Sequence, residues 1–230
     1  MTYLPFKSGF ILTSNRDEIL SRAATTFPSY LENGPMKICF PRDPLSNGSW
    51  IALTRERTTC LLNGAFEKHD RNASYRKSRG TVLLESFVYD DLRAFADEYE
   101  FDDIEPFTMV AIESRASTVG VSQLIWDGEK AHVEVLPPGT KRIWSSVTLY
   151  DQGVRQRRQL YFESVNLSDE RAILNFHQTK SEELGSENSF FMSRTNGPCT
   201  ISTTQVKHID DRISMEYIDY ITEQSKMEKL

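Results

Sequence analysis

The sequence predicts an α+β protein built in layers, and three observations carry this prediction. Short apolar segments of strand type gather in three blocks, at about residues 2–63, 107–136 and 189–221. Two segments with helical spacing of their apolar residues, 78–98 and 150–179, separate these blocks. Strand blocks divided by helical blocks, without strict strand–helix alternation, favour antiparallel sheets with helices on their outer faces.

The first block begins with a predicted hairpin. Thr2–Pro5 and the continuous apolar run Phe10–Ser14 flank a turn at Lys7-Ser8-Gly9. Residues 21–35 contain two prolines and one glycine and have no clear period, so they are predicted to form a loop. Short strands of a β-meander are expected at residues 37–41, 49–54 and 58–63.

The next segments alternate between helix and strand patterns. The helical segment 78–98 is expected to break at Tyr89-Asp90-Asp91. The apolar segments 107–113, 119–126 and 131–136 read as strands, and Asp127-Gly128 between the last two is a strong hairpin signal. In the second helical segment, 150–179, Ser168 is a good N-cap.

The last block contains three expected strands. They are "FFMSR", "CTISTTQV" and "RISMEYIDYI", within residues 189–221. A helix is the alternative for the last of them.

Length favours a single domain, and the net charge argues against nucleic acid as a partner. A chain of 230 residues can bury one sizeable core, so a single domain over residues 1–230 is the default. The net charge of −6 disfavours nucleic acid as a partner. The basic run Asp70–Arg79 is better explained as a solvated loop than as an anion-binding patch.

Cysteine usage and hydropathy point to a cytoplasmic protein. The three cysteines are widely spaced and imply no disulfide framework. The sequence shows neither a secretion signal nor an apolar stretch of about 18 residues, so no transmembrane segment is expected. The cysteines and the four histidines lack metal-ligand spacing, and neither a metal nor another cofactor is predicted.

The most informative stretch is the polar cluster Asn15-Arg16-Asp17-Glu18, which follows an apolar strand. An Arg can lower a neighbouring pKa or hold a carboxylate, a carboxylate can orient an amine or water, and an amide can bind an oxyanion. Because successive side chains of a strand point to opposite faces, Asn15 and Asp17 should project one way and Arg16 and Glu18 the other. The alternative reading is a solvated turn with a surface ion pair.

Four motifs in order, "GFILTSNRDE", "NGSWIAL", "TTCLLNGAF" and "YRKSRG", resemble those of the NRDE family, which includes the transport and Golgi organisation proteins of animals. The family resembles the N-terminal nucleophile hydrolases of the choloylglycine hydrolase type. The resemblance therefore implies a four-layer αββα sandwich of antiparallel sheets. Relatives in that superfamily cut amide bonds with an amino-terminal Cys that serves as nucleophile and base.

The resemblance also implies roles for individual residues. Arg16 and Asp17 lie beside the nucleophile as catalytic residues, with Asn15 and Glu18 contributing to substrate binding. Asn63 is the expected oxyanion donor, and a turn at Asn63-Gly64 is its alternative. Two further expected substrate-binding residues are Ser146, where relatives carry Asn, and Arg194, whose alternative is a surface salt bridge.

The expected nucleophile is the main departure from the family pattern. Family members usually begin Met-Cys, whereas this sequence begins Met1-Thr2. Thr2 is one candidate nucleophile, because an N-terminal threonine can perform the same chemistry. The family opening often reads Cys-Thr-Val-Thr-Tyr. The start of this sequence, Met1-Thr2-Tyr3, aligns with its last three residues if Met1 occupies the position of the valine. The second candidate is therefore a Cys just upstream, in which case the chain as it stands is inactive.

Two functions follow from the resemblance. The first is hydrolysis of a carbon–nitrogen bond in a small amide. The second is a non-catalytic carrier or trafficking protein that binds haem or acyl-CoA-type lipids, as the links of the animal relatives suggest. None of the four histidines lies in a recognisable haem motif.

Overall fold

The computed structural model describes residues 1–22, 25–33, 36–70, 74–115, 118–210 and 212–230. They form two compact units, each built on one antiparallel sheet, and the predicted α+β class is confirmed. The first unit comprises Met1–Ala24, Thr140–Ser145 and Leu149–Leu230, and the second comprises Thr25–Gly139 and Ser146–Thr148. The single domain and the four-layer order stay predictions.

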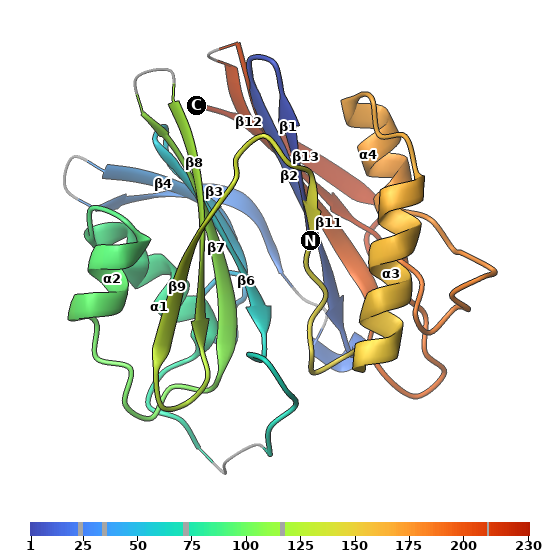
Figure 1. Cartoon of the computed structure of the whole chain (residues 1–230), viewed down its shortest axis with the longest axis horizontal. Coiled ribbons are helices and arrows are strands. Elements are labelled where there is room, and N and C mark those ends of the chain that lie inside the picture. Colours follow the sequence, from blue (N-terminus) through green and yellow to red (C-terminus); the bar gives the residue numbers. More distant parts are fainter. Residues whose placement is uncertain (23–24, 34–35, 71–73, 116–117, 211) are drawn as a thin grey trace. The chain divides into compact units, whose positions relative to one another are not determined.

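The first unit is a six-stranded sheet with helices along one face (Figure 1). In sheet order the strands are β10 (Arg142–Ile143), β1 (Thr2–Phe6), β2 (Gly9–Glu18), β11 (Cys199–Ile209), β12 (Arg212–Asp219) and β13 (Gln224–Lys229). The helices are α3 (Gln152–Ser164) and α4 (Glu170–His177), with a short 3-10 turn, η1, at Leu20–Arg22. The predicted hairpin of β1 and β2 is confirmed.

Alternation along β1 and β2 decides which side chains face the helices. Leu4 and Ile11 are fully or almost fully buried and pack with Phe162 of α3 and with Ile173 and Phe176 of α4. Because the ladder sets Leu4 opposite Ile11, both strands turn the same face to the helices. Among the described residues, α3 and α4 both lie on this side, and the opposite face of the sheet, where Arg16 meets η1, is called the helix-free face below.

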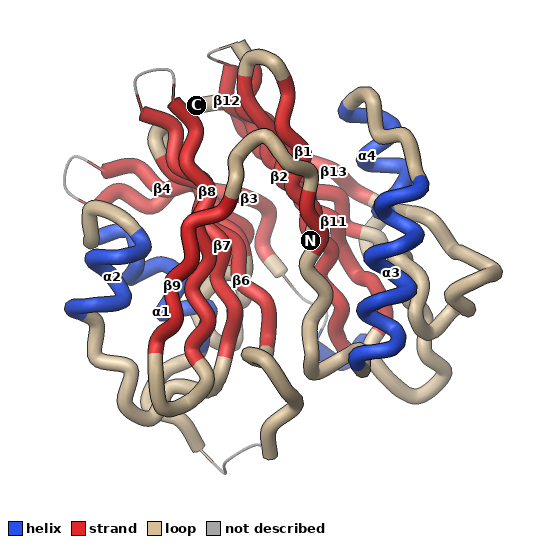
Figure 2. The backbone as a smooth tube through the Cα atoms, in the orientation of Figure 1, coloured by secondary structure: helices blue, strands red, loops and turns tan. Residues whose placement is uncertain are grey.

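The second unit is a seven-stranded sheet. In sheet order the strands are β3 (Thr26–Asn33), β4 (Met36–Arg42), β5 (Ile51–Leu53), β6 (Arg57–Asn63), β7 (Phe107–Arg115), β8 (Thr118–Trp126) and β9 (Ala131–Leu136). Its helices are α1 (Arg79–Glu85), the 3-10 turn η2 (Ser86–Val88) and α2 (Leu92–Glu98). They lie on one face of the sheet (Figure 2). Val82, Leu83 and Phe95 of these helices are fully buried in the core.

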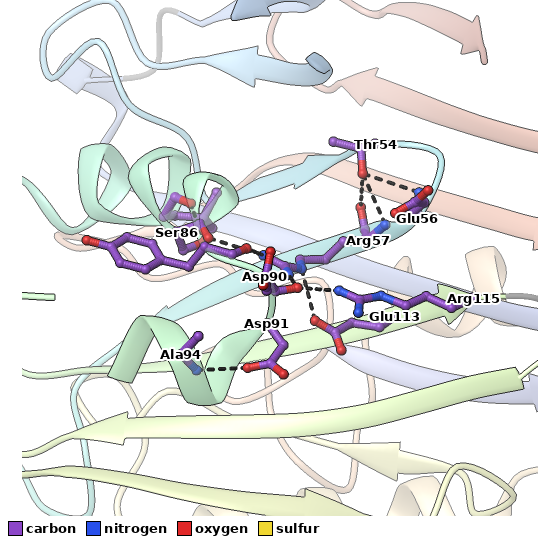
Figure 3. A network of polar contacts seen from close by, with 11 residues as sticks. Thr54, Glu56, Arg57, Ser86, Asp90, Asp91, Ala94, Glu113 and Arg115 are labelled. Carbon is purple, nitrogen blue, oxygen red and sulfur yellow. Dashed lines mark hydrogen bonds and ion pairs between the residues drawn. The ribbon is translucent and has the colours of Figure 1, made fainter. Parts of the chain in front are cut away.

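A buried arginine explains why the helical segment breaks where the sequence predicted (Figure 3). Arg57 of β6 pairs with Glu113 of β7, with 3.0 Å between Nε and Oε1. Its Nη1 donates to the carbonyls of Ser86 and Tyr89 at 3.1 and 3.0 Å, and its Nη2 donates to the carbonyl of Asp90. The Ser86 carbonyl also accepts the N–H of Tyr89, and Tyr89 and Asp90 follow the end of η2, so Arg57 holds the chain where the helix stops.

The second helix then restarts directly after this junction. The Asp91 side chain accepts a hydrogen bond from the backbone N–H of Ala94 at 2.8 Å and caps α2. The predicted break at Tyr89-Asp90-Asp91 is therefore confirmed, and the charged groups of the sheet fix its geometry.

Three sequence predictions are wrong. Part of the predicted loop 21–35 is strand β3, although residues 23–24 and 34–35 lie outside the described residues. Pro28 is tolerated because β3 is an edge strand whose register shifts between Thr26 and Ser29. The helical segment 150–179 contains α3 and α4 as two helices, but the N-cap of α4 is Asp169, one residue after the predicted Ser168.

The segment "FFMSR" is the third error, because it forms no strand. Phe190 and Met192 are buried and Phe191 is half-buried, but the backbone amides donate to a loop carbonyl and to a side chain of β11. The N–H of Phe191 donates to the carbonyl of Thr179, and that of Met192 donates to Thr200 Oγ1. Burial pattern alone could not distinguish this packed loop from a strand.

Two strands were not predicted at all. β10 has two residues, and β13 reads "QSKMEK", which is mostly exposed. "RISMEYID" is strand β12 rather than the helix considered as its alternative, and β13 forms by pairing with it.

Residues 71–73 of the predicted basic loop lie outside the described residues. The described part of the chain contains no helix with the length and hydropathy of a membrane span.

Two of the four sequence motifs meet through glycine backbones. The N–H of Ser49 in "NGSWIAL" donates to the carbonyl of Gly80 in "YRKSRG" at 3.1 Å. A Cβ added at Gly48 would lie 2.3 Å from the backbone carbon of Gly80, so no side chain fits between the two segments. The motif glycines are therefore explained by close backbone packing.

We expect Gly48→Ala to destabilise the protein by about 1–3 kcal/mol, because the contact is with backbone that cannot move aside. Denaturant unfolding monitored by circular dichroism measures this change. Gly139→Ala is the matched control, since a Cβ there meets nothing within 4 Å, and it should stay within about 0.5 kcal/mol of the parent. Equal stabilities of the two variants would contradict this account of the motif.

Candidate functional site

Strand β2 distributes the cluster at residues 15–18 over both faces of its sheet. Asn15 points to the helix side, where its Nδ2 donates to the carbonyls of His177 and Phe190 at 2.9 and 2.8 Å. Asp17 points the same way, and Arg16 and Glu18 point to the helix-free face. This is the division that the period of a strand predicts, so the cluster forms two separate groups.

On the helix side, Asp17 lies among positive charges. Thr200 Oγ1 donates to Asp17 Oδ1 at 2.6 Å. Burial raises the pKa of Asp17, while the Thr200 hydrogen bond, Arg158, the chain's amino group and Arg194 each oppose that rise. The structure therefore places two predicted site residues, Asp17 and Arg194, in one electrostatic cluster with the amino end of β1.

Arg158 is the member of this cluster that sequence reasoning missed. Its guanidinium stacks between the rings of Tyr150 and Phe190, 4.2 and 4.4 Å from their centroids. Nη1 donates to the Asn188 and Ser189 carbonyls at 2.6 and 2.8 Å. The sequence did contain a signal for its burial. Arg158 lies four residues from both Val154 and Phe162, so all three side chains fall on the buried face of α3.

The guanidinium of Arg194 donates hydrogen bonds to backbone carbonyls. Nη2 donates to the carbonyl of Leu149 at 2.7 Å, and Nε donates to that of Glu187 at 3.2 Å. The group also lies 5.8 Å from the centre of the Tyr150 ring. These bonds join two loops of the first unit, and the predicted role of Arg194 in substrate binding stays a prediction.

A second helix-side group joins Thr2, His177 and Asn15. His177 Nε2 lies 2.8 Å from Thr2 Oγ1, and His177 Nδ1 lies 3.1 Å from Asn15 Oδ1. Because the amide of Asn15 donates to two carbonyls, its Oδ1 must accept, so His177 carries its proton on Nδ1. Thr2 therefore donates its hydroxyl proton to Nε2.

This order of hydroxyl, imidazole and amide resembles a nucleophile with its base. Thr2 is 0% and His177 2% exposed, however, so the hydroxyl has no open side. The group ties β1, β2 and α4 together. Thr2 and Arg16 point to opposite faces of the sheet, and the structure does not bring the Thr2 hydroxyl to the Arg16 side.

On the helix-free face, Arg16 is 8% exposed. Its Nη2 lies 3.9 Å from Glu18 Oε2, and the same oxygen lies 3.4 Å from Nη1 of Arg22. Arg16 is thus a buried guanidinium that shares one carboxylate with a second arginine. Burying a charge costs desolvation free energy, which opposite charges and hydrogen bonds around it must offset.

The remaining predicted residues, Asn63 and Ser146, belong to the second unit. Ser146 Oγ donates to the backbone carbonyl of Asn63 at 2.7 Å, and the Asn63 residue is exposed. Gly64 follows with a φ of +87°, and a Cβ there would lie 2.3 Å from Cγ2 of Val147. Asn63 is the last residue of β6 and Gly64 follows it without a turn, and the oxyanion role of Asn63 stays a prediction.

Comparison with known proteins supplies one result. The sequence model of the family described as Transport and Golgi organisation 2 matches residues 4–194. No curated protein matches the chain. Among the described residues, no three His, Cys, Asp or Glu side chains are placed to hold a metal ion together.

We expect His177 to make folding sensitive to acid. Burial lowers its pKa well below 6.5, so below about pH 6.5 the unfolded chain binds a proton that the folded chain refuses. This contribution to stability is complete above that pH and is lost by up to about 1.4 kcal/mol per pH unit as the pH falls. Urea unfolding between pH 7.5 and 5 measures the slope.

His177→Gln should flatten this slope, because it removes the buried imidazole. A slope that is the same in the parent chain and in His177→Gln would contradict the prediction.

Proposed function

The chain belongs to the Transport and Golgi organisation 2 family, and we propose that it hydrolyses a carbon–nitrogen bond of a small amide on the helix-free face around Arg16. The observation that carries this proposal is a buried guanidinium beside the amino end of the first strand. N-terminal nucleophile hydrolases, which the family resembles, need a positive group at that place, because it lowers the pKa of the nucleophile.

The β1–β2 register supports the position of the nucleophile. The ladder sets Thr2 opposite Thr13 and Tyr3 opposite Leu12. Counted back along the same register, Met1 is level with Ser14, and a residue two places earlier is level with Arg16. If Met1 stands at the valine of Cys-Thr-Val-Thr-Tyr, the family cysteine is the residue beside Arg16, on the same face.

The reaction then follows from general chemistry. The amino group takes the proton of the thiol, and the thiolate attacks the amide carbonyl carbon. The carbon–nitrogen bond breaks as the nitrogen takes up that proton, leaving a thioester that water hydrolyses to the acid. Arg16 stabilises the thiolate before attack, and its charge is most effective because it is buried.

The decisive experiment introduces a cysteine at this position. A variant that carries Cys-Thr-Val in place of Met1 is incubated with a β-lactam and with activated N-acyl amides. Intact-protein mass spectrometry should show acylation at the new Cys, and amine release should show turnover. The 230-residue chain, and a variant with Ala-Thr-Val in place of Met1, should show neither.

Arg16 is tested in the same cysteine variant. Arg16→Gln should lower the acylation rate roughly 10²-fold, because the thiolate loses its positive neighbour. Arg22→Gln is the matched control, since Arg22 pairs with the same Glu18 but is 40% exposed, and it should retain the rate. A folded cysteine variant that is never acylated, but binds haem or acyl-CoA unmodified, would refute hydrolysis and favour a carrier.

A further inference from the structure

Among the described strands, β13 forms the longest regular edge of either sheet. At the other edges, β10 has two residues, β3 contains Pro28 and a register shift, and the Val133 carbonyl of β9 accepts a hydrogen bond from Arg93 Nη2 at 3.4 Å. Short strands, prolines, bulges and covering groups protect an edge from pairing with another strand. By contrast, β13 is six residues long, contains no proline and pairs with β12 without a register shift.

The backbone groups of β13 alternate between β12 and the outer edge. The N–H of Leu230 donates to the carbonyl of Ile213 at 3.0 Å, so Leu230 turns its backbone groups to β12. Because alternate residues of an antiparallel strand bond the same neighbour, Ser225 and Met227 turn their N–H and carbonyl groups to the outer edge. No described strand lies beyond β13 in the sheet order. A further strand can therefore be added at this edge.

The side chains of β13 are self-complementary about Met227. Lys226 and Glu228 point to one face, with 2.7 Å between Nζ and Oε1, and their side chains are 47% and 20% exposed. Met227 points to the other face and is 44% exposed. A lysine at an edge ordinarily repels an approaching strand, but here the neighbouring carboxylate offsets its charge. An antiparallel copy of this strand brings the carboxylate of one strand opposite the ammonium of the other.

We propose that β13 pairs with β13 of a second copy of this chain, antiparallel and about a two-fold axis at Met227. Because opposed residues share a face of the sheet, such an axis must set one residue opposite its own counterpart. An axis at Lys226 or at Glu228 would oppose like charges, which is destabilising. The axis at Met227 instead sets Lys226 opposite the partner's Glu228, twice in each dimer, and brings the two exposed methionines together. This inference is independent of the proposed reaction.

Sedimentation equilibrium of the 230-residue chain measures the assembly. One strand pair buries less area than a standard interface, so we expect a reversible dimer with a dissociation constant in the micromolar range and twice the chain mass of 26.5 kDa. Added salt should weaken the dimer, because its charged pairs are partly exposed. A chain that stays monomeric up to millimolar concentration overturns the inference.

Charge reversal tests the predicted pairs. Lys226→Glu and Glu228→Lys each set like charges opposite each other, so each should raise the dissociation constant at least tenfold. The double variant restores opposite charges and should return to within about threefold of the parent. Lys229→Glu is the matched control, since this exposed lysine of the same strand lies opposite the partner's Ser225, and it should also stay within about threefold. A double variant that dimerises no better than the single variants overturns the inference.

Introduced cysteines test the register itself. Met227→Cys should form a disulfide-linked dimer on oxidation, because the opposed Cα atoms of a hydrogen-bonded pair lie about 5.5 Å apart, within the range of a disulfide. Ser225→Cys is the matched control, because in this register its counterpart lies roughly 14 Å away and cannot be bridged. Non-reducing gel electrophoresis measures both, with the parent chain as baseline for its three cysteines. Failure of Met227→Cys to cross-link, or equal cross-linking of Ser225→Cys, overturns the inference.

Discussion

Successive side chains of a strand must point to opposite faces, and the site depends on this constraint. Strand β2 lies between β1 and β11, so both of its edges are hydrogen-bonded within the first unit's sheet. Asn15 and Asp17 join the helix side, and Arg16 and Glu18 the other. A cluster that is continuous in sequence is therefore divided into two groups, one bonded to the helix side of the sheet and one on the opposite face.

The helix side is built for rigidity. Asn15 uses both ends of its amide, Arg158 is held by two rings and two carbonyls, and His177 is bonded at both ring nitrogens. Such a fully bonded layer fixes the backbone of β1 and β2, and with it the position of every side chain on the helix-free face. Precise placement of Arg16 thus comes from residues that never touch its side of the sheet.

Much of the fold could be predicted from sequence, because hydrophobic period and turn chemistry are local. The β1–β2 hairpin, the β8–β9 turn and the break before α2 were found in this way. β13 was missed because an exposed edge strand has no apolar alternation, and "FFMSR" was misread because a packed loop buries the same residues as a strand. The polar string of the site was visible in sequence, whereas Arg158 and His177 join it only through the packing of α3 and α4 on the sheet.

The direct backbone contact between Gly48 and Gly80 has an evolutionary consequence. Each position requires glycine only while the backbone of the opposite segment lies against it. The two glycines should therefore be inherited as a pair. A chimaera of two homologues with its crossover between these residues would remain foldable only if both parents have glycine at the joined positions. The pair therefore marks a stretch of about thirty residues that recombination cannot divide freely.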